Sequence, residues 1–482
     1  QPDLEQPVYD FTVYDEQWSA VPAEMRILGN IAPQGPRDEG RCLPGSWLPV
    51  DEVQYVDFVK ATVERYDGDG VDDMPGLVNP ITYWQVGNEP NDAVRSGFAQ
   101  LQRMTYQAIK DVCPQCQVLI GGATGFPNNY IEDFDTFYAP ILADLAGQGF
   151  DIFDFHWYGT ATGEYRLLDT MSGRDVLTHV EAALLRFGFP DDVPIWITEM
   201  GSYSGDPVDF GKQVLPFQSE RQQASDYCKR LIYPLSRGVK KVFPAFGLME
   251  GFKYDDGYFD HTGLIYDGED FGKGNDPEDG GDPGMGVKKL AYYTIKKMTE
   301  KLEGSDWENI HIIETGVENT YAYRFKRDDL PVWVAWWDYF LDPDYESGDS
   351  KQVHFTNGMS SRVVAKNVVP RYSSGSEVSD YGTAFFVDTL NVYMGNVFVP
   401  VGQDPVIIEV LQDPPEEKGD LNRDGVINIV DVLRVVHLIL HLPPPPTDYD
   451  LWAADYNSDG RIDILDVVGI VSVILGTGHY GP

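Results

Sequence analysis

Two glutamates of this sequence each close an apolar stretch that is typical of a buried strand. Glu89 lies in I-T-Y-W-Q-V-G-N-E-P, and Glu199 lies in V-P-I-W-I-T-E-M-G. β-branched and aromatic residues dominate both stretches, and neither carries a charge before its glutamate. A pair of carboxyl groups in one site is what glycoside hydrolysis requires. The chemistry therefore needs a fold that brings the two strand ends together.

In a retaining mechanism the two carboxyl groups lie about 5–5.5 Å apart, one protonated and one ionised. The charge of the ionised group raises the pKa of its neighbour, which keeps the acid protonated near neutral pH. A single glutamate at a strand end is usually a surface or salt-bridged carboxylate. Two in such similar contexts favour a shared site.

Apolar strands alternate with helices over residues 11–302, which predicts a parallel α/β architecture. A (β/α)₈ TIM barrel fits best, because its strand ends converge on one catalytic face. The expected strands are 25–32, 81–87, 118–122, 150–158, 193–201 and 241–249. The expected helices are 11–23, 51–66, 98–112, 130–146, 174–187, 219–237 and 286–302.

The predicted strands and helices form six strand–helix units, whereas a closed barrel needs eight. If Glu89 ends strand four and Glu199 ends strand seven, the strand at 25–32 is the third. The first two strands are then missing or hidden in residues 1–9, which are too few for both. We expect either a shortened chain or an N-terminal part that comes from another polypeptide.

Residues 310–410 carry short β-rich runs such as T-Y-A-Y-R-F and P-V-W-V-A-W-W, which predict an antiparallel β-sandwich. We expect it to support the barrel rather than to bind carbohydrate. The predicted domains are a barrel over 1–305, a β-sandwich over 306–412, a linker over 413–419 and a small all-α, EF-hand-like domain over 420–478.

The last domain contains an internal repeat. D-L-N-R-D-G-V-I-N-I-V-D recurs as D-Y-N-S-D-G-R-I-D-I-L-D, and an apolar helix follows each copy. Oxygen ligands in this pattern, with glycine at the sixth position, predict two calcium loops. The candidate ligands are Asp420, Asn422, Asp424, Val426, Asn428 and Asp431 in the first loop, and Asp455, Asn457, Asp459, Arg461, Asp463 and Asp466 in the second.

The acidic turn at 66–76, Y-D-G-D-G-V-D-D-M-P-G, could hold a further calcium ion near Asp67–Asp73. A solvated loop explains it equally well.

The formal charge of −41 argues against nucleic acid or an anionic membrane as a partner. No apolar run is long enough to span a bilayer, and no signal peptide is present, as in a mature secreted protein or a trimmed one. Cys113 and Cys116, in C-P-Q-C, favour a short-range disulfide in an oxidising compartment. Cys42 and Cys228 could pair with each other or stay reduced.

The paired calcium loops with their apolar helices resemble a type I dockerin over about 418–476. This resemblance implies an extracellular, calcium-dependent module that binds a cohesin domain. Ile429–Val430 and Ile464–Leu465 stand where such modules often carry hydroxyl or small residues. A cohesin-like domain or another copy of this chain is therefore the expected partner.

Residues 11–302 resemble clan A glycoside hydrolases, most closely the β-xylosidase-like members. That likeness implies Glu89 as acid/base and Glu199 as nucleophile, with Asn88 at the sugar 2-hydroxyl. Tyr158, or His156 beside it, would hydrogen-bond the nucleophile; a structural role for His156 is equally plausible. The strand-two arginine of the clan has no counterpart here, and A-F-G-L-M-E-G-F stands where its last-strand tryptophan is expected.

Two hypotheses follow. In the first, the chain is a secreted or cell-surface-attached retaining β-glycosidase of plant or microbial polysaccharide, anchored through a calcium-loaded dockerin. In the second, a degenerate barrel forms the body of an extracellular filament or scaffold protein. The sequence names neither the sugar nor the choice between exo and endo action.

Overall fold

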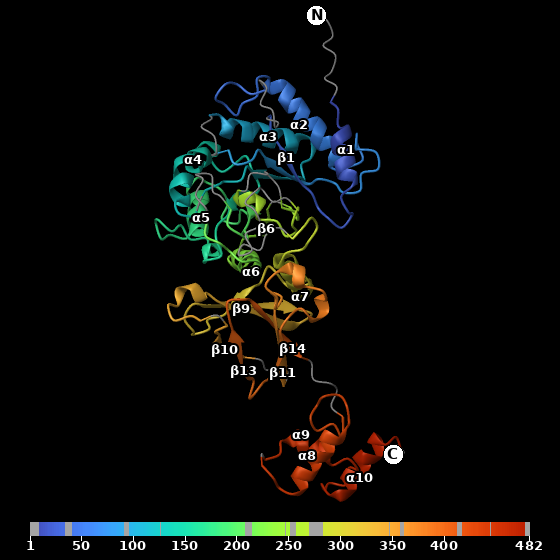
Figure 1. Cartoon of the computed structure of the whole chain (residues 1–482). Helices are drawn as coiled ribbons and strands as arrows, with labels where there is room; N and C mark the ends of the chain where they lie inside the picture. The colour runs from blue at the N-terminus through green and yellow to red at the C-terminus, as the bar shows by residue number, and fades with distance from the viewer. Residues whose placement is uncertain are drawn as a thin grey trace, which may run out of the picture.

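The computed structural model describes residues 9–33, 41–90, 96–125, 127–207, 215–245, 247–250, 257–268, 283–346, 348–356, 361–411, 417–443 and 445–477. Three parts follow one another along an elongated molecule (Figure 1). An α/β part is followed by an antiparallel part, and a small helical part carries the C-terminus.

The α/β part is a parallel sheet whose strands follow the order of the chain. Its strands are β1 (Leu28–Ile31), β2 (Tyr83–Val86), β3 (Gln117–Ile120), β4 (Phe153–Trp157), β5 (Ile195–Met200) and β6 (Lys241–Pro244). Bridges from Leu119 to Ile152 and from Ala123 to Phe155 join β3 to β4.

The sequence predicts a (β/α)₈ barrel that lacks its first two strands, and over the described residues the strands do not close into a barrel. Within the described residues, β1 and β6 each pair with a strand on one side only. The six strand–helix units account for all six parallel strands, and closure needs two more. Residues 1–8, which hold most of the segment where further strands could be hidden, lie outside the described residues.

Helices alternate with these strands as the sequence predicts. They are α1 (Thr12–Ser19), α2 (Glu52–Tyr66), α3 (Phe98–Val112), α4 (Tyr130–Leu145), α5 (Val176–Arg186), α6 (Glu220–Ser236) and α7 (Leu290–Leu302). Asp51 caps α2 by accepting a hydrogen bond from the Gln54 amide, and Ser219 opens α6 with a capping box. The main hydrophobic core joins the buried faces of these helices to the sheet.

A separate apolar cluster takes one side chain from each strand or from the residue just before it. Its members are Leu28, Tyr83, Leu119, Ile152, Trp196 and Phe243. Because the cluster is distinct from the core shared with the helices, it belongs to the other face of the sheet.

The next part consists of antiparallel strands, as expected. They are β7 (His311–Ile312), β8 (Thr320–Arg327), β9 (Leu330–Trp337), β10 (Lys351–Thr356), β11 (Arg362–Asn367), β12 (Val387–Asn391), β13 (Asn396–Val401) and β14 (Val406–Leu411). The larger sheet has the order β12-β11-β14-β9-β8-β7, and β10 pairs with β13. Trp333, Phe355 and Val399 belong to a core shared by both sheets.

Helix α6 lies where the α/β part meets the antiparallel part (Figure 1), and its side chains contact both. Glu220, at the start of α6, accepts hydrogen bonds from the amides of Leu290 and Gly375, at 2.7 and 2.8 Å. Arg221 forms an ion pair with Asp404. The described residues also form short 3₁₀ turns at Glu164–Arg166, Tyr258–Asp260, Tyr339–Leu341, Gly375–Glu377 and Tyr381–Thr383.

The C-terminal part contains α8 (Ile429–Ile439), α9 (Asp448–Ala454) and α10 (Ile464–Ile474). The expected linker at 413–419 lies mostly outside the described residues. Helix α9 was not expected, because the four prolines before it suggest an extended connection. Thr447 and Asp450 form a capping box that starts this helix directly after them.

The cysteines divide into two groups. Cys113 and Cys116 form the short-range disulfide that the sequence favours. Cys42 and Cys228 are both buried and are not bonded to each other. Over the part of the chain that the structure describes, no helix has the length and apolar character to cross a membrane.

Candidate active site

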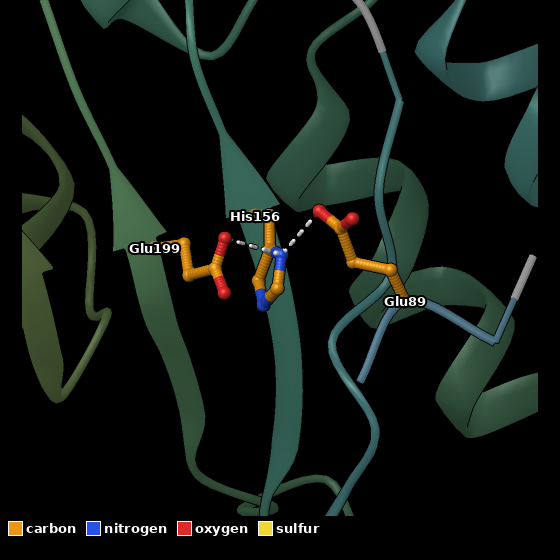
Figure 2. A group of neighbouring side chains, drawn as sticks. All are labelled: Glu89, His156 and Glu199. Atoms are coloured by element: carbon orange, nitrogen blue, oxygen red, sulfur yellow. Dashed lines mark hydrogen bonds and ion pairs between the residues drawn. The ribbon is translucent and has the colours of Figure 1, made fainter. Parts of the chain in front are cut away.

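Glu89 sits on a sharp turn just after β2. Gly87 has φ 70°, and Glu89 itself has φ 41°, in the left-handed region that residues with a side chain rarely adopt. Such a conformation costs about 1–3 kcal/mol and persists only where the surroundings impose it. The strained turn directs the Glu89 carboxyl toward the ends of β4 and β5 (Figure 2).

His156 and Glu199 are neighbours on adjacent strands. The pairing of β4 with β5 shifts between Phe155 and His156, so that Thr198 is passed over and His156 pairs with Glu199. Such bulges re-aim side chains beside active sites. Here the shift brings the imidazole and the second carboxylate side by side.

The three side chains converge on one nitrogen (Figure 2). Nδ1 of His156 lies 2.7 Å from Oε1 of Glu89 and 3.2 Å from Oε2 of Glu199. One carboxylate oxygen of Glu89 lies within 4.8 Å of one of Glu199. Tyr158 donates its hydroxyl to Oε2 of Glu199 at 2.5 Å.

A buried hydrogen-bond chain fixes the other side of the His156 ring. Thr198 donates its hydroxyl to Oδ2 of Asp154 at 2.6 Å, and the amide of Gln85 donates to the same oxygen at 2.7 Å. The Thr198 oxygen is therefore the acceptor for Nε2 of His156, 3.2 Å away. This assigns a proton to Nε2.

With Nε2 protonated, Nδ1 has two possible states. In a neutral ring it accepts a hydrogen bond from a protonated carboxyl group, and in an imidazolium it donates its own proton in hydrogen bonds to the two carboxylates. In both states one further proton is shared among Glu89, His156 and Glu199. An acid/base catalyst needs one such proton close to the bond that breaks, so that it can be transferred to the leaving group.

The electrostatics of the site follow from burial and charge. Burial lowers the pKa of His156, but the hydrogen bond that the ring donates to Glu89 and the charges of Glu199 and Asp154 outweigh it, so the net shift is upward. Burial raises the pKa of Asp154 to about 7. Burial and then the charge of Glu199 raise the pKa of Tyr158 far above its usual range, so its hydroxyl stays a donor.

Two neighbouring positions complete the site. A Cβ at Gly122, just after β3, would lie 2.0 Å from Nε2 of His156, so only glycine leaves room for the ring. Asn88 is exposed beside Glu89, on the side open to solvent.

The sequence predicts one site for Glu89, Asn88, His156, Tyr158 and Glu199. The structure brings Glu89, His156, Tyr158 and Glu199 into contact at the ends of β2, β4 and β5, and it leaves Asn88 exposed beside Glu89. Sequence reasoning missed the supporting residues: Asp154, Thr198, Gln85 and Gly122. Alternation along β4 carried a signal for one of them, because residues 154, 156 and 158 point to the same face of a strand.

The Glu89–His156–Glu199 group also offers ligand atoms that could hold a metal ion. Its own hydrogen bonds explain the arrangement without one. The C-terminal loops are more clearly built for a metal, since their donor atoms are oxygens throughout.

The two C-terminal loops have the same internal geometry. Asp420 accepts hydrogen bonds from the amides of Asp424 and Gly425, and Asp455 does so from those of Asp459 and Gly460. The buried carboxylates of Asp431 and Asp466 close the loops by accepting from residues three and nine positions earlier.

The backbone conformations of the two C-terminal loops also match. Arg423 has φ 56° and Ser458 has φ 60°, each followed two residues later by a left-handed glycine. The side chains proposed as ligands therefore lie in loops of matching shape. Val426 and Arg461 offer backbone carbonyls at the same position of each loop.

Residues 418–472 match the dockerin type I domain family. The C-terminal part is a type I dockerin domain. Domains of this type typically bind calcium, and a dockerin implies binding to a cohesin. The oxygen-lined loops of this dockerin fit the ion.

Solved structures confirm a likeness in fold to glycoside hydrolases. A family 39 glycoside hydrolase from the gut symbiont Bacteroides cellulosilyticus WH2 matches with a TM-score of 0.50 and 17% identity, over 78% of this chain and 65% of that one. A glucosidase from Croceicoccus marinus matches with a TM-score of 0.54 and 16% identity, over 83% and 82%.

At these identities the likeness shows the fold. The chain spans less than two thirds of the length of the family 39 protein. No curated protein sequence matches it.

Proposed function

We propose that the chain is a retaining glycoside hydrolase of plant or microbial polysaccharide, with Glu199 as nucleophile and Glu89 as acid/base. The supporting observation is the separation of the two carboxylates, with oxygens within 4.8 Å. Inverting enzymes hold their carboxyl groups about 6.5–9.5 Å apart to admit a water molecule between them and the sugar. The closer spacing here favours direct attack by a carboxylate.

In the first step Glu199 attacks the anomeric carbon while Glu89 gives its proton to the leaving oxygen, and the glycosidic bond breaks. In the second step Glu89 takes a proton from water, which displaces Glu199 from the sugar. Tyr158 holds Glu199 in the attacking orientation. His156 holds the proton that the two carboxyl groups share, and Asn88 faces the sugar 2-hydroxyl.

We propose further that the dockerin, loaded with two calcium ions, attaches this enzyme to a cohesin in an extracellular cellulosome. The outer faces of its helices support this role. Val432, Val435, Val467 and Ile470 are buried between the helices. An apolar set at the start of α8 and α10 stays exposed: Ile429, Val430, Leu433, Ile464, Leu465 and Val468. Equivalent positions of the two repeats thus form a surface suited to a protein partner.

The open sheet favours a second candidate, an extracellular assembly protein. Strand edges without partners can pair with another chain, and within the described residues both β1 and β6 have such an edge. Measurement of molecular size with and without EDTA separates the candidates. Calcium-dependent polymers of this chain alone would favour assembly, and a monomer that chelation leaves unchanged would contradict it.

Hydrolysis of a panel of aryl β-glycosides and plant polysaccharides tests the enzyme. We expect turnover by the wild type and a loss of about a thousandfold or more in Glu199→Ala. Glu89→Ala should retain more activity on substrates with good leaving groups, because these need no protonation. No turnover by folded, calcium-loaded protein on any substrate would contradict the proposal.

A further inference from the structure

The loop between α2 and β2 is compact and strongly acidic. It begins as α2 ends at Tyr66 and reads D-G-D-G-V-D-D over residues 67–73. The amide of Met74 returns to the carbonyl of Arg65 at 2.8 Å. Gly68, Gly70 and Asp72 all have left-handed backbones, with φ 78°, 96° and 47°. The turn is therefore wound tightly rather than extended.

Three carboxylates of this loop converge. One oxygen each from Asp67, Asp69 and Asp73 lie within 4.8 Å of one another. Asp73 accepts hydrogen bonds from the amides of Gly68 and Gly70, which holds its carboxylate over the turn. Over the described part of the chain, no lysine or arginine forms an ion pair with these three aspartates.

Asp67 is the decisive residue. Its side chain is 4% exposed, and its Oδ2 is buried without a hydrogen-bond partner. Its Oδ1 accepts one bond, from the Asp69 amide at 3.3 Å. A buried carboxylate oxygen without a partner is costly and calls for an explanation. Burial raises the pKa of Asp67, and the charges of Asp69 and Asp73 raise it further.

We propose that Asp67, Asp69 and Asp73 form a binding site for a divalent cation of the calcium class, separate from the dockerin loops. A hard cation supplies the positive charge that the three carboxylates lack and a partner for the orphaned oxygen. Carboxylate donors with backbone carbonyls and water are the ligands that calcium prefers.

The position of the site indicates its role. The loop enters β2 at its N-terminal end, where the amide of Ile81 bonds the carbonyl of Tyr66 at 2.7 Å. Glu89 follows the opposite end of the same strand. In barrels built from parallel strands, groups at the N-terminal ends of the strands serve stability rather than catalysis, and we expect the same of this open sheet. The bound ion therefore holds the end of α2 against the start of β2.

Equilibrium dialysis of the full chain with radioactive calcium tests the site. We expect the wild type to bind one ion more than the pair assigned to the dockerin loops, and Asp67→Asn to lose that one. The matched control, Asp424→Asn with Asp459→Asn, weakens both dockerin loops and should keep it. Equal stoichiometry in wild type and Asp67→Asn would overturn the proposal.

Thermal unfolding of the α/β part gives a second readout in the dockerin control background. Calcium should raise its midpoint, and Asp67→Asn should abolish that rise. In EDTA the same variant should be the more stable protein, since it removes an unpartnered buried charge. If it does not fold, the exposed Asp69→Asn is measured instead, with an expected loss of affinity of at least about tenfold. A calcium-induced rise that survives both substitutions would also refute the site.

Discussion

Thr198 accepts a hydrogen bond from Nε2 of His156 while it donates its own hydroxyl to Asp154. Through these two hydrogen bonds Thr198, which precedes the proposed nucleophile Glu199, orients the imidazole ring of His156. The proton chemistry of the site therefore depends on a residue that touches neither the proposed substrate nor Glu89.

Thr198→Val should impair catalysis without unfolding the protein. Valine keeps the shape of threonine but removes both hydrogen bonds, so the ring can change tautomer. We expect kcat/KM to fall about tenfold or more, equivalent to one lost hydrogen bond of about 1.4 kcal/mol. The pH–rate profile should shift as well. Thr198→Ser keeps the hydroxyl group and should therefore keep the wild-type kcat/KM and pH–rate profile. A pH–rate profile that is unchanged in Thr198→Val would refute the orienting role of Thr198.

Asp154 should make the free energy of unfolding fall as pH rises. Its pKa is about 7 in the folded chain and near its ordinary value of 3.8 when unfolded. Between those values the folded state holds a proton that the unfolded state releases, so stability present at low pH is lost toward pH 7. The slope is at most about 1.4 kcal/mol per pH unit.

Urea unfolding at several pH values in excess calcium, wild type against Asp154→Asn, measures this slope. The variant should show a shallower fall. His156, whose pKa is also raised, contributes in the same direction and remains in both proteins. Equal slopes would show that Asp154 stays ionised throughout.

Gly122→Ala should displace the His156 ring. The added methyl group would meet Nε2 at 2.0 Å, so the ring must leave its position between the carboxylates. We expect a loss of about 1–3 kcal/mol in stability together with loss of activity. Gly402→Ala is the control, because its nearest neighbour would lie at 3.4 Å. Full activity in Gly122→Ala would mean that the ring position is not required.

Calcium removal should unfold the dockerin and leave the rest of the chain intact. Each loop contains a buried carboxylate, Asp431 or Asp466, together with further aspartates, and a bound ion would offset the repulsion within the loop. EDTA should therefore abolish cohesin binding in calorimetry and lower the helical circular dichroism. Asp431→Ala should act like EDTA on one loop, whereas Asp448→Asn, exposed on α9, should have no effect. Cohesin binding that persists in EDTA would refute the calcium dependence.

Much of the architecture could be predicted from local pattern. Helix α3 has the bounds that its apolar spacing predicts, 98–112, and the six parallel strands lie where β-branched runs occur. The proximity of Glu89 and Glu199 followed from the convergence of strand ends. Their catalytic roles remain predictions.

What could not be predicted depends on register and on contacts distant in sequence. The shift that passes over Thr198 has no local signature, so the chain from Gln85 through Asp154 to His156 could not be foreseen. Helix α9 follows four prolines and is marked only by its capping box. The proposed cation site at Asp67 rests on a buried oxygen without a hydrogen-bond partner, and burial is a property of the folded chain.

The strained backbone of Glu89 matters for any attempt to raise the thermal stability of this protein. Glycine adopts its φ of 41° without strain, and asparagine does so more readily than glutamate. Substitution at this position would relax the turn while it removes the proposed acid/base. A screen for thermal stability alone would therefore enrich substitutions of Glu89 that abolish the proposed activity. Such a screen must select for turnover at the same time.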